Sequence, residues 1–161
     1  MKISTFDTRR KTGLDIVPMH ITSPEFTYND YIPARFTCDG INISPPLDID
    51  HLPTGTKCLA IIVDDPDAPI RPWVHWVAWN IPASQHLKED CLLKEQGIND
   101  FREHKYGGPC PPYGTHRYYF KVYALDRRLD LPVQSSRNEL EKAMEGRVIG
   151  FGELMGRYRR R

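Results

Sequence analysis

Apolar and β-branched residues recur along this chain in short runs that turn-forming residues separate. Four runs have the length and composition of strands, and they cover residues 16–22, 57–64, 74–81 and 117–125. Turn signals such as Asp39-Gly40 and Pro111-Pro-Tyr-Gly114 lie between them. This pattern predicts a mainly β protein.

One helix is predicted near the carboxyl end. Ser136 and Glu139 have the spacing of a capping box, in which each side chain bonds to a backbone N–H of the other residue. Leu140, Ala143 and Met144 then fall on one helical face, and a glycine at position 146 can end the helix. A short helix among strands indicates a β-sandwich or a barrel, and periodicity alone does not choose between them.

Composition narrows the class of protein. The 161 residues predict a single domain, 1–161, of which the polar residues 1–14 are expected to be a loose amino-terminal segment. Proline, at 14 residues, argues against a helical bundle because it breaks helix interiors. Lysine plus arginine (22) nearly balances aspartate plus glutamate (21), so no overall field favours nucleic acid or an anionic membrane. The longest apolar run is too short to span a membrane, and we expect a cytoplasmic protein.

The four cysteines show no Cys-x-x-Cys pair. Cys38, Cys58, Cys91 and Cys110 are widely spaced, which disfavours a zinc site. We therefore expect reduced and mostly buried thiols.

Polar residues gather at the ends of three predicted strands. Strict alternation along 74–81 would put His75 on the face of Val77, opposite Trp76. A histidine among such apolar neighbours is, taken alone, typical of a structural residue. His116 and Tyr118 share a face at the start of another strand, roughly 7 Å apart. At the end of a third strand, Asp65 and Asp67 flank a proline, either as an Asx turn or as the rim of a site.

Two kinds of chemistry remain open from these residues. The aspartates and histidines could bind a metal, but no His-x-x-x-His pair is present and we predict no metal. A hydrolase would need a nucleophile, yet there is no Gly-x-Ser-x-Gly motif, and nothing in the sequence marks Cys110, the nearest candidate, as an activated thiol.

Several ordered blocks resemble the signatures of the phosphatidylethanolamine-binding protein (PEBP) family, which includes the Raf kinase inhibitor protein. They are Asp65-Pro-Asp-Ala-Pro69, Trp73-Val-His75 and Gly108-Pro-Cys-Pro-Pro-Tyr-Gly-Thr-His-Arg-Tyr118. Residues 37–40 and 44–47 resemble the family's amino-terminal block, so the likeness extends from about residue 18 to 158. The short loop before His116 and the ending near Tyr158 resemble the bacterial and archaeal branch.

The resemblance implies an antiparallel β-sandwich with short helices and a pocket for a small phosphorylated or anionic ligand. It predicts a binding protein without turnover or cofactor, with Asp65 orienting the donors of His75 and His116. Inhibition of a protease or kinase and hydrolysis of a phosphoester are the alternatives, and a homodimer through the surface near Tyr113 is also expected. Carried over by position, the ligand-binding residues are Asp65, Asp67, Trp73, His75, Gly108, Pro111, Pro112, His116 and Tyr118.

Overall fold

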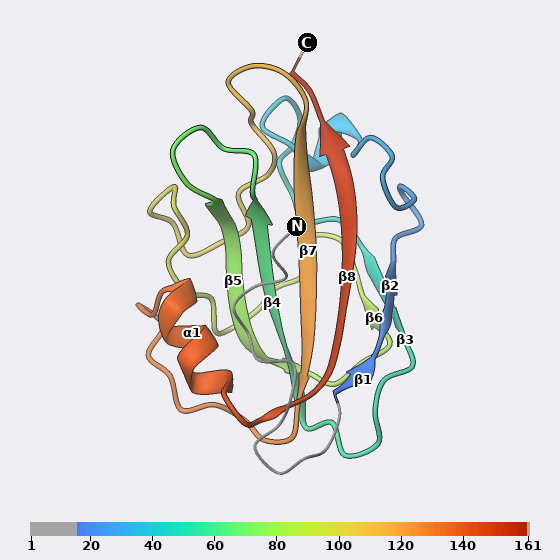
Figure 1. Ribbon diagram of the computed structural model, residues 1–161, viewed down its shortest axis with the longest axis vertical. Coiled ribbons are helices and arrows are strands. Elements are labelled where there is room, and N and C mark those ends of the chain that lie inside the picture. The colour runs from blue at the N-terminus through green and yellow to red at the C-terminus, as the bar shows by residue number, and fades with distance from the viewer. Residues whose placement is uncertain (1–15, 161) are drawn as a thin grey trace.

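The computed structural model describes residues 16–160 and contains two β-sheets, one α-helix and one short 3-10 helix (Figure 1). The larger sheet has the strand order β1, β8, β7, β4, β5, in which β1 runs parallel to β8 and the other neighbours are antiparallel. The smaller sheet has the antiparallel order β2, β3, β6. The strands of the larger sheet are β1 (Val17–Pro18), β4 (Cys58–Asp65), β5 (Trp73–Pro82), β7 (His116–Leu125) and β8 (Val148–Tyr158); those of the smaller sheet are β2 (His20–Thr22), β3 (Leu47–Asp50) and β6 (His86–Leu87).

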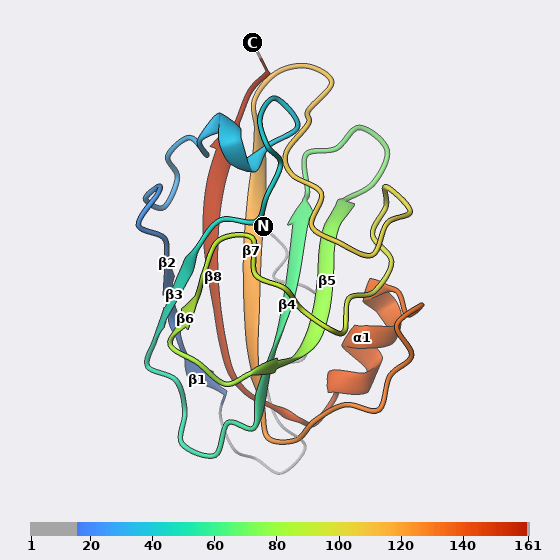
Figure 2. The same cartoon turned by 180° about the vertical axis from the view of Figure 1, so that it is seen from behind.

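The main core lies on one face of the larger sheet. Alternate residues of β7, namely Tyr118, Phe120 and Val122, point into it, where they meet Ile21 of β2 and Leu47 of β3. From behind, the smaller sheet and the chain between β6 and β7 lie over this face (Figure 2). The mainly β fold predicted by the pattern and the β-sandwich implied by the family resemblance are both confirmed.

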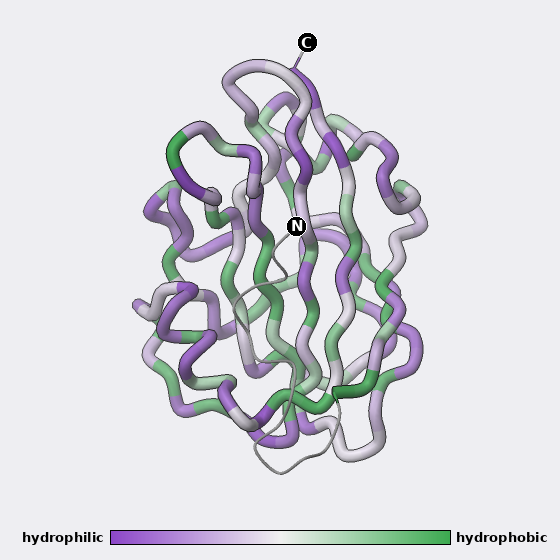
Figure 3. The backbone as a smooth tube through the Cα atoms, viewed as in Figure 1, coloured by the Kyte–Doolittle hydropathy of each residue, from purple (hydrophilic) through white to green (hydrophobic). Residues whose placement is uncertain are grey.

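The opposite face carries the helix α1 (Arg137–Met144) and a second apolar cluster. Leu140 and Met144 are buried there, and the capping box of Ser136 and Glu139 is present as predicted. Gly146 has φ +73°, the left-handed conformation expected after the helix. Hydrophobic positions follow β4 through the middle of the sheet, while the loops are mostly hydrophilic (Figure 3).

The predicted alternation of β5 is wrong because the strand contains register shifts. Val63 pairs with Trp76 and Asp64 with Val74, so His75 is an extra residue in β5. His75 and Trp76 consequently both face the inter-sheet side: the His75 ring contacts Tyr118, and Trp76 belongs to the main core. Val77 packs on the helix side instead.

The expectation of four reduced cysteines is also wrong. Cys38 and Cys110 form a disulfide across 72 positions of sequence, with their Cα atoms 5.5 Å apart, whereas Cys58 and Cys91 are free. The bond joins the segment after the 3-10 helix η1 (Ala34–Phe36) to the loop before β7. Within residues 16–160, no helix is long and apolar enough to cross a membrane.

Candidate functional site

A pocket of about 240 Å³ lies where β4 ends and where β5 and β7 begin. Most of its wall is apolar, and the polar groups are two imidazoles, one carboxylate and one phenol. Such a cup with a few convergent polar groups is the usual form of a small-molecule site. The lining residues are Asp65, Ala68, Pro69, Trp73, His75, Phe101, Cys110, Pro111, Pro112, His116 and Tyr118.

Asp65 and His116 form a buried pair in this pocket. Oδ2 of Asp65 lies 2.7 Å from Nδ1 of His116, and the side chains are only 5% and 7% exposed. The other carboxylate oxygen accepts the backbone N–H of Asp67 at 2.8 Å. A carboxylate accepts at this contact, so Nδ1 of His116 carries the proton and Nε2 remains for a ligand. The sequence-based expectation had Asp65 orienting both His75 and His116, and its hydrogen-bond partner is His116.

His75 is held by the loop that precedes β7. Its Nδ1 lies 2.7 Å from the carbonyl oxygen of Gly107 and therefore donates to it. Its ring meets Phe101 and Tyr118 edge to face, with centroids 5.2 Å apart in both cases. Burial lowers the pKa of His75, although the Gly107 bond and the charge of Asp65 oppose this shift. The neutral imidazole is thereby favoured, with Nε2 as an acceptor.

Tyr118 contributes a phenol from the same face of β7 as His116. Burial raises the pKa of its hydroxyl, and the negative charge of Asp65 adds to the effect. The hydroxyl therefore stays protonated and can donate a hydrogen bond to a ligand.

Two residues expected in the pocket lie outside its lining. Asp67 faces Arg117, whose Nε and Nη2 donate to its carboxylate at 2.9 and 2.8 Å, and these bonds lower the pKa of Asp67. Gly108 donates its N–H to Oδ1 of Asn42 at 2.8 Å. A Cβ at Gly108 would collide with the Phe36 carbonyl oxygen, so this glycine permits close packing of two loops.

Four lining residues, Phe101, Ala68, Pro69 and Cys110, are not among the predicted site residues. Pro69 belongs to the motif that follows β4, and Cys110 had been considered only as a nucleophile. Phe101 had no sequence signal, because it comes from an irregular loop and approaches His75 only in the folded chain.

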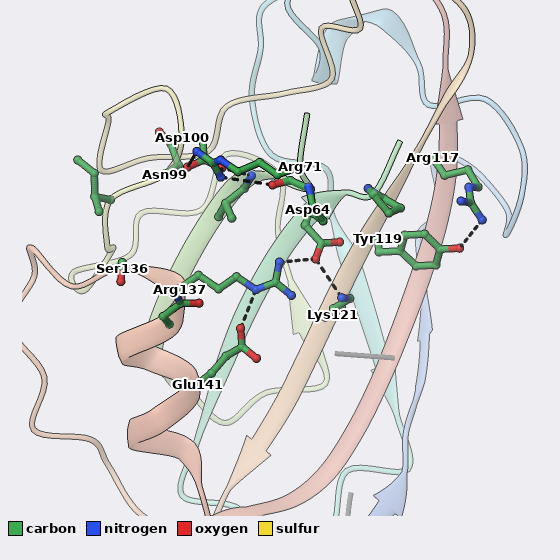
Figure 4. Close-up of a pocket in the computed structure, with 15 residues that line it drawn as sticks. Asp64, Arg71, Asn99, Asp100, Arg117, Tyr119, Lys121, Ser136, Arg137 and Glu141 are labelled. Carbon is green, nitrogen blue, oxygen red and sulfur yellow. Dashed lines mark hydrogen bonds and ion pairs between the residues drawn. The ribbon is translucent and has the colours of Figure 1, made fainter. Parts of the chain in front are cut away.

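A larger cavity of about 550 Å³ lies on the helix side of the sheet (Figure 4). Oδ2 of Asp64 lies 3.0 Å from Nζ of Lys121 and 2.6 Å from Nη1 of Arg137. Nε of Arg137 also donates to Glu141 at 2.7 Å. These groups connect β4, β7 and α1 by ion pairs within the protein, so their structural role is clear. Asp64 and Asp65 are thus consecutive residues that serve opposite faces of the sheet.

No metal centre is evident in the described part of the chain. Residues 16–160 contain no group of three or more His, Cys, Asp and Glu side chains arranged to hold a metal ion.

Comparison with known proteins identifies the family. Residues 22–159 match the family model described as phosphatidylethanolamine-binding protein. The chain belongs to the PEBP family. The UPF0098 protein PH1269 of Pyrococcus horikoshii is 50% identical over 150 residues, which cover 86% of this chain and 76% of the relative. A UPF0098 protein of Methanothermobacter thermautotrophicus is 48% identical, covering 88% and 99% of the two chains.

Solved PEBP structures share the fold. The putative PEBP homologue CT736 of Chlamydia trachomatis superimposes with a TM-score of 0.85 at 39% identity, covering 89% of this chain and 99% of CT736. YbcL of Escherichia coli, described as a member of the mammalian PEBP family, gives 0.82 at 33% identity with the same coverages. These relatives place the chain among PEBP proteins of prokaryotic type.

Proposed function

We propose that this PEBP-family protein binds a small phosphate-type anion in the pocket of Asp65 and His116 and does not transform it. The observation that carries the proposal is the buried Asp65–His116 pair, which opens into an apolar cup beside His75 and Tyr118. In a partly desolvated site, a few charge-assisted hydrogen bonds can hold an anion without a large basic surface.

The polar groups suit a monoanionic phosphate. In its imidazolium form His116 donates Nδ1–H to Asp65 and can donate Nε2–H to a phosphate oxygen. Tyr118 supplies a neutral donor. His75, kept neutral by burial, offers Nε2 as an acceptor for the one protonated oxygen of the monoanion. The site therefore combines donors with one acceptor, as a monoanionic phosphate ester requires.

The same residues support binding in preference to hydrolysis. Cys110, the nearest candidate nucleophile in the sequence, is part of a disulfide and has no thiolate to offer. The residues that line the pocket include no serine or threonine. A hydrogen-bonded Asp–His pair orients a donor equally well for ligand binding, and we assign it that role.

Three further features belong to the proposal. Two exposed apolar residues, Ile70 and Tyr113, directly follow the lining residues Pro69 and Pro112 in sequence, which suits inhibition or regulation of a partner that presents an anionic group. We also propose that the protein forms a homodimer through the surface near Tyr113, and light scattering measures its oligomeric state.

We propose a cytoplasmic location, which cell fractionation tests.

Phosphorus NMR separates binding from turnover. Phosphoethanolamine and p-nitrophenyl phosphate are each incubated with the protein, and the ester and inorganic phosphate signals are followed over time. We expect the ester signal to shift or broaden, to recover when excess inorganic phosphate is added, and to keep its integral. Sustained release of phosphate that is lost in His116→Ala would show an enzyme and contradict the proposal.

A further inference from the structure

The disulfide Cys38–Cys110 forms part of the pocket wall. Cys110 lines the pocket, and it is followed in the chain by Pro111 and Pro112, which line it too. The bond joins the loop after η1 to the loop before β7. Both ribbon views show these two loops near each other at one end of the molecule (Figures 1 and 2). Because this bond holds part of the pocket wall, breaking it would change the shape of the anion pocket.

Residues 111–115 are held mainly near their two ends, because Pro111 is buried whereas residues 112–115 are exposed. In the described part of the chain, these five residues form no turn, loop or side-chain hydrogen bond with the rest of the protein. At the carboxyl end, His116 is fixed by Asp65. At the amino end, the disulfide at Cys110 supplies the covalent anchor.

The chain before Cys110 is held independently of the disulfide. Gly107 bonds to His75 through both its N–H and its carbonyl group, and Gly108 bonds to Asn42. The N–H of Cys38 donates to the carbonyl oxygen of Pro109 at 3.1 Å. Loss of the disulfide should therefore leave these contacts and the sheets in place, and loosen chiefly residues 110–115.

Neither cysteine of the disulfide is fully buried. Both Cys38 and Cys110 are partly exposed, whereas the free Cys58 is fully buried. Thiol–disulfide exchange requires access of a thiolate to one of the sulfur atoms. A partly exposed bond can meet this requirement without global unfolding.

We propose that Cys38–Cys110 is a redox-active site whose reduction by a dithiol loosens residues 110–115 and weakens anion binding in the pocket. One thiolate of the dithiol attacks a cystine sulfur, which breaks the S–S bond, forms a mixed disulfide and releases the other cysteine. The second thiol of the reagent then displaces the remaining cysteine. Two electrons and two protons pass to the protein, which gains two thiols, and the dithiol leaves as its own disulfide.

The size of the effect follows from the population of the competent conformation. This inference rests on the proposed function, because it concerns affinity for phosphate. If the reduced segment occupies the closed arrangement about one tenth of the time, the apparent dissociation constant rises about tenfold.

The test uses the full chain in a Cys91→Ser background, which removes the free thiol that is partly exposed. Inorganic phosphate is titrated by NMR into the oxidised protein, into the same protein reduced with dithiothreitol, and into the Cys38→Ser/Cys110→Ser variant. We expect reduced and doubly substituted proteins to remain folded by circular dichroism and to bind phosphate about tenfold more weakly. Equal affinity in the folded oxidised and reduced forms would overturn the inference.

A ligand-free measurement separates this inference from the proposed function. Backbone order parameters of Tyr113, Gly114 and Thr115 are compared between the two redox forms, and we expect a fall below about 0.6 on reduction. If they fall while the oxidised protein binds no phosphate, the loosening is supported and the proposed function fails. If they do not change, or if dithiothreitol reduces the pair only under unfolding conditions, the redox site is refuted. Should the double variant not fold, the reduced protein decides the outcome.

Discussion

The carboxylate of Asp65 lies 2.7 Å from Nδ1 of His116, although 51 positions separate the two residues in sequence. The contact forms because β4 and β7 are antiparallel neighbours, so the end of one strand lies beside the start of the other. Both side chains are buried, which strengthens their interaction, and both line the pocket.

Asp65→Asn should weaken phosphate binding by roughly ten- to a hundredfold. The substitution replaces the carboxylate that accepts the Nδ1–H of His116 and orients the ring, and a charge-assisted hydrogen bond contributes about 1.5–3 kcal/mol. Asp67→Asn is the matched control from the same turn after β4, because Asp67 faces Arg117 outside the pocket. Calorimetric titration with phosphate should show a large loss for the first variant and a change within about twofold for the second. Equal losses would show that the effect comes from the backbone of residues 65–67 and not from the carboxylate of Asp65.

Protonation of His75 should make the protein less stable in mild acid. Burial lowers the pKa of His75 in the folded state, while an unfolded histidine titrates near about 6.5. As the pH falls below that value, the unfolded chain binds a proton that the folded protein does not, so the free energy of unfolding decreases. His75→Asn keeps a side-chain N–H for the Gly107 carbonyl but does not titrate, and should flatten this slope.

Urea unfolding between pH 7.5 and 5 measures the effect of His75→Asn. His104→Asn serves as the control, because the exposed His104 also bonds through Nδ1 to a backbone carbonyl. A slope as steep in His75→Asn as in the wild type would assign the acid sensitivity to other groups.

Much of the fold could be predicted because it depends on local patterns. Runs at 57–64 and 117–125 correspond to β4 and β7, and the capping box located α1. β8 was missed because its glycines, including Gly152, weaken the apolar pattern. A side chain at Gly152 would collide with the Met19 carbonyl oxygen, so close approach of another chain segment decides that position.

The candidate site was less predictable where a single residue or a distant partner decided the geometry. The extra residue in β5 turns His75 toward Tyr118, and strict alternation cannot anticipate it. The pairing of Cys38 with Cys110 depends on how two remote loops meet, which cysteine spacing does not reveal. Asp67 shares a motif with Asp65, yet the turn after β4 directs it toward Arg117.

Asp64→Asn should destabilise the fold by about 3–5 kcal/mol, the range seen when one member of a buried ion pair is removed. The change leaves the buried ammonium of Lys121 without its carboxylate and weakens the link of Arg137 to the sheet. Glu89→Gln breaks the exposed pair with Arg35 and should cost at most about 1 kcal/mol. Urea denaturation compares the two, and similar costs would contradict the structural role assigned to Asp64.

Glu153→Gln should stabilise the protein at neutral pH. Burial raises the pKa of Glu153 despite the opposing charge of Lys121, so ionisation is less favourable in the folded than in the unfolded state. The cost begins as the pH rises past the unfolded value, near about 4.3, and is complete above the folded pKa. The melting temperature of the variant should therefore exceed that of the wild type at pH 7 and differ less at pH 4. A lower melting temperature at pH 7 would show that attraction to Lys121 prevails.

The central claim is that the pocket binds phosphate through its imidazoles, and calorimetric titration of inorganic phosphate tests it most directly. Four proteins are compared: the wild type, His75→Ala, His116→Ala, and a variant with Arg159 and Arg160 both changed to Ala. The net charge of the chain is only +1, so long-range attraction is weak and short hydrogen bonds should dominate. We predict that each histidine variant binds roughly ten- to a hundredfold more weakly and that the arginine variant binds like the wild type. Unchanged binding in both histidine variants together with loss in the arginine variant would contradict the claim and assign phosphate binding to the basic carboxyl end.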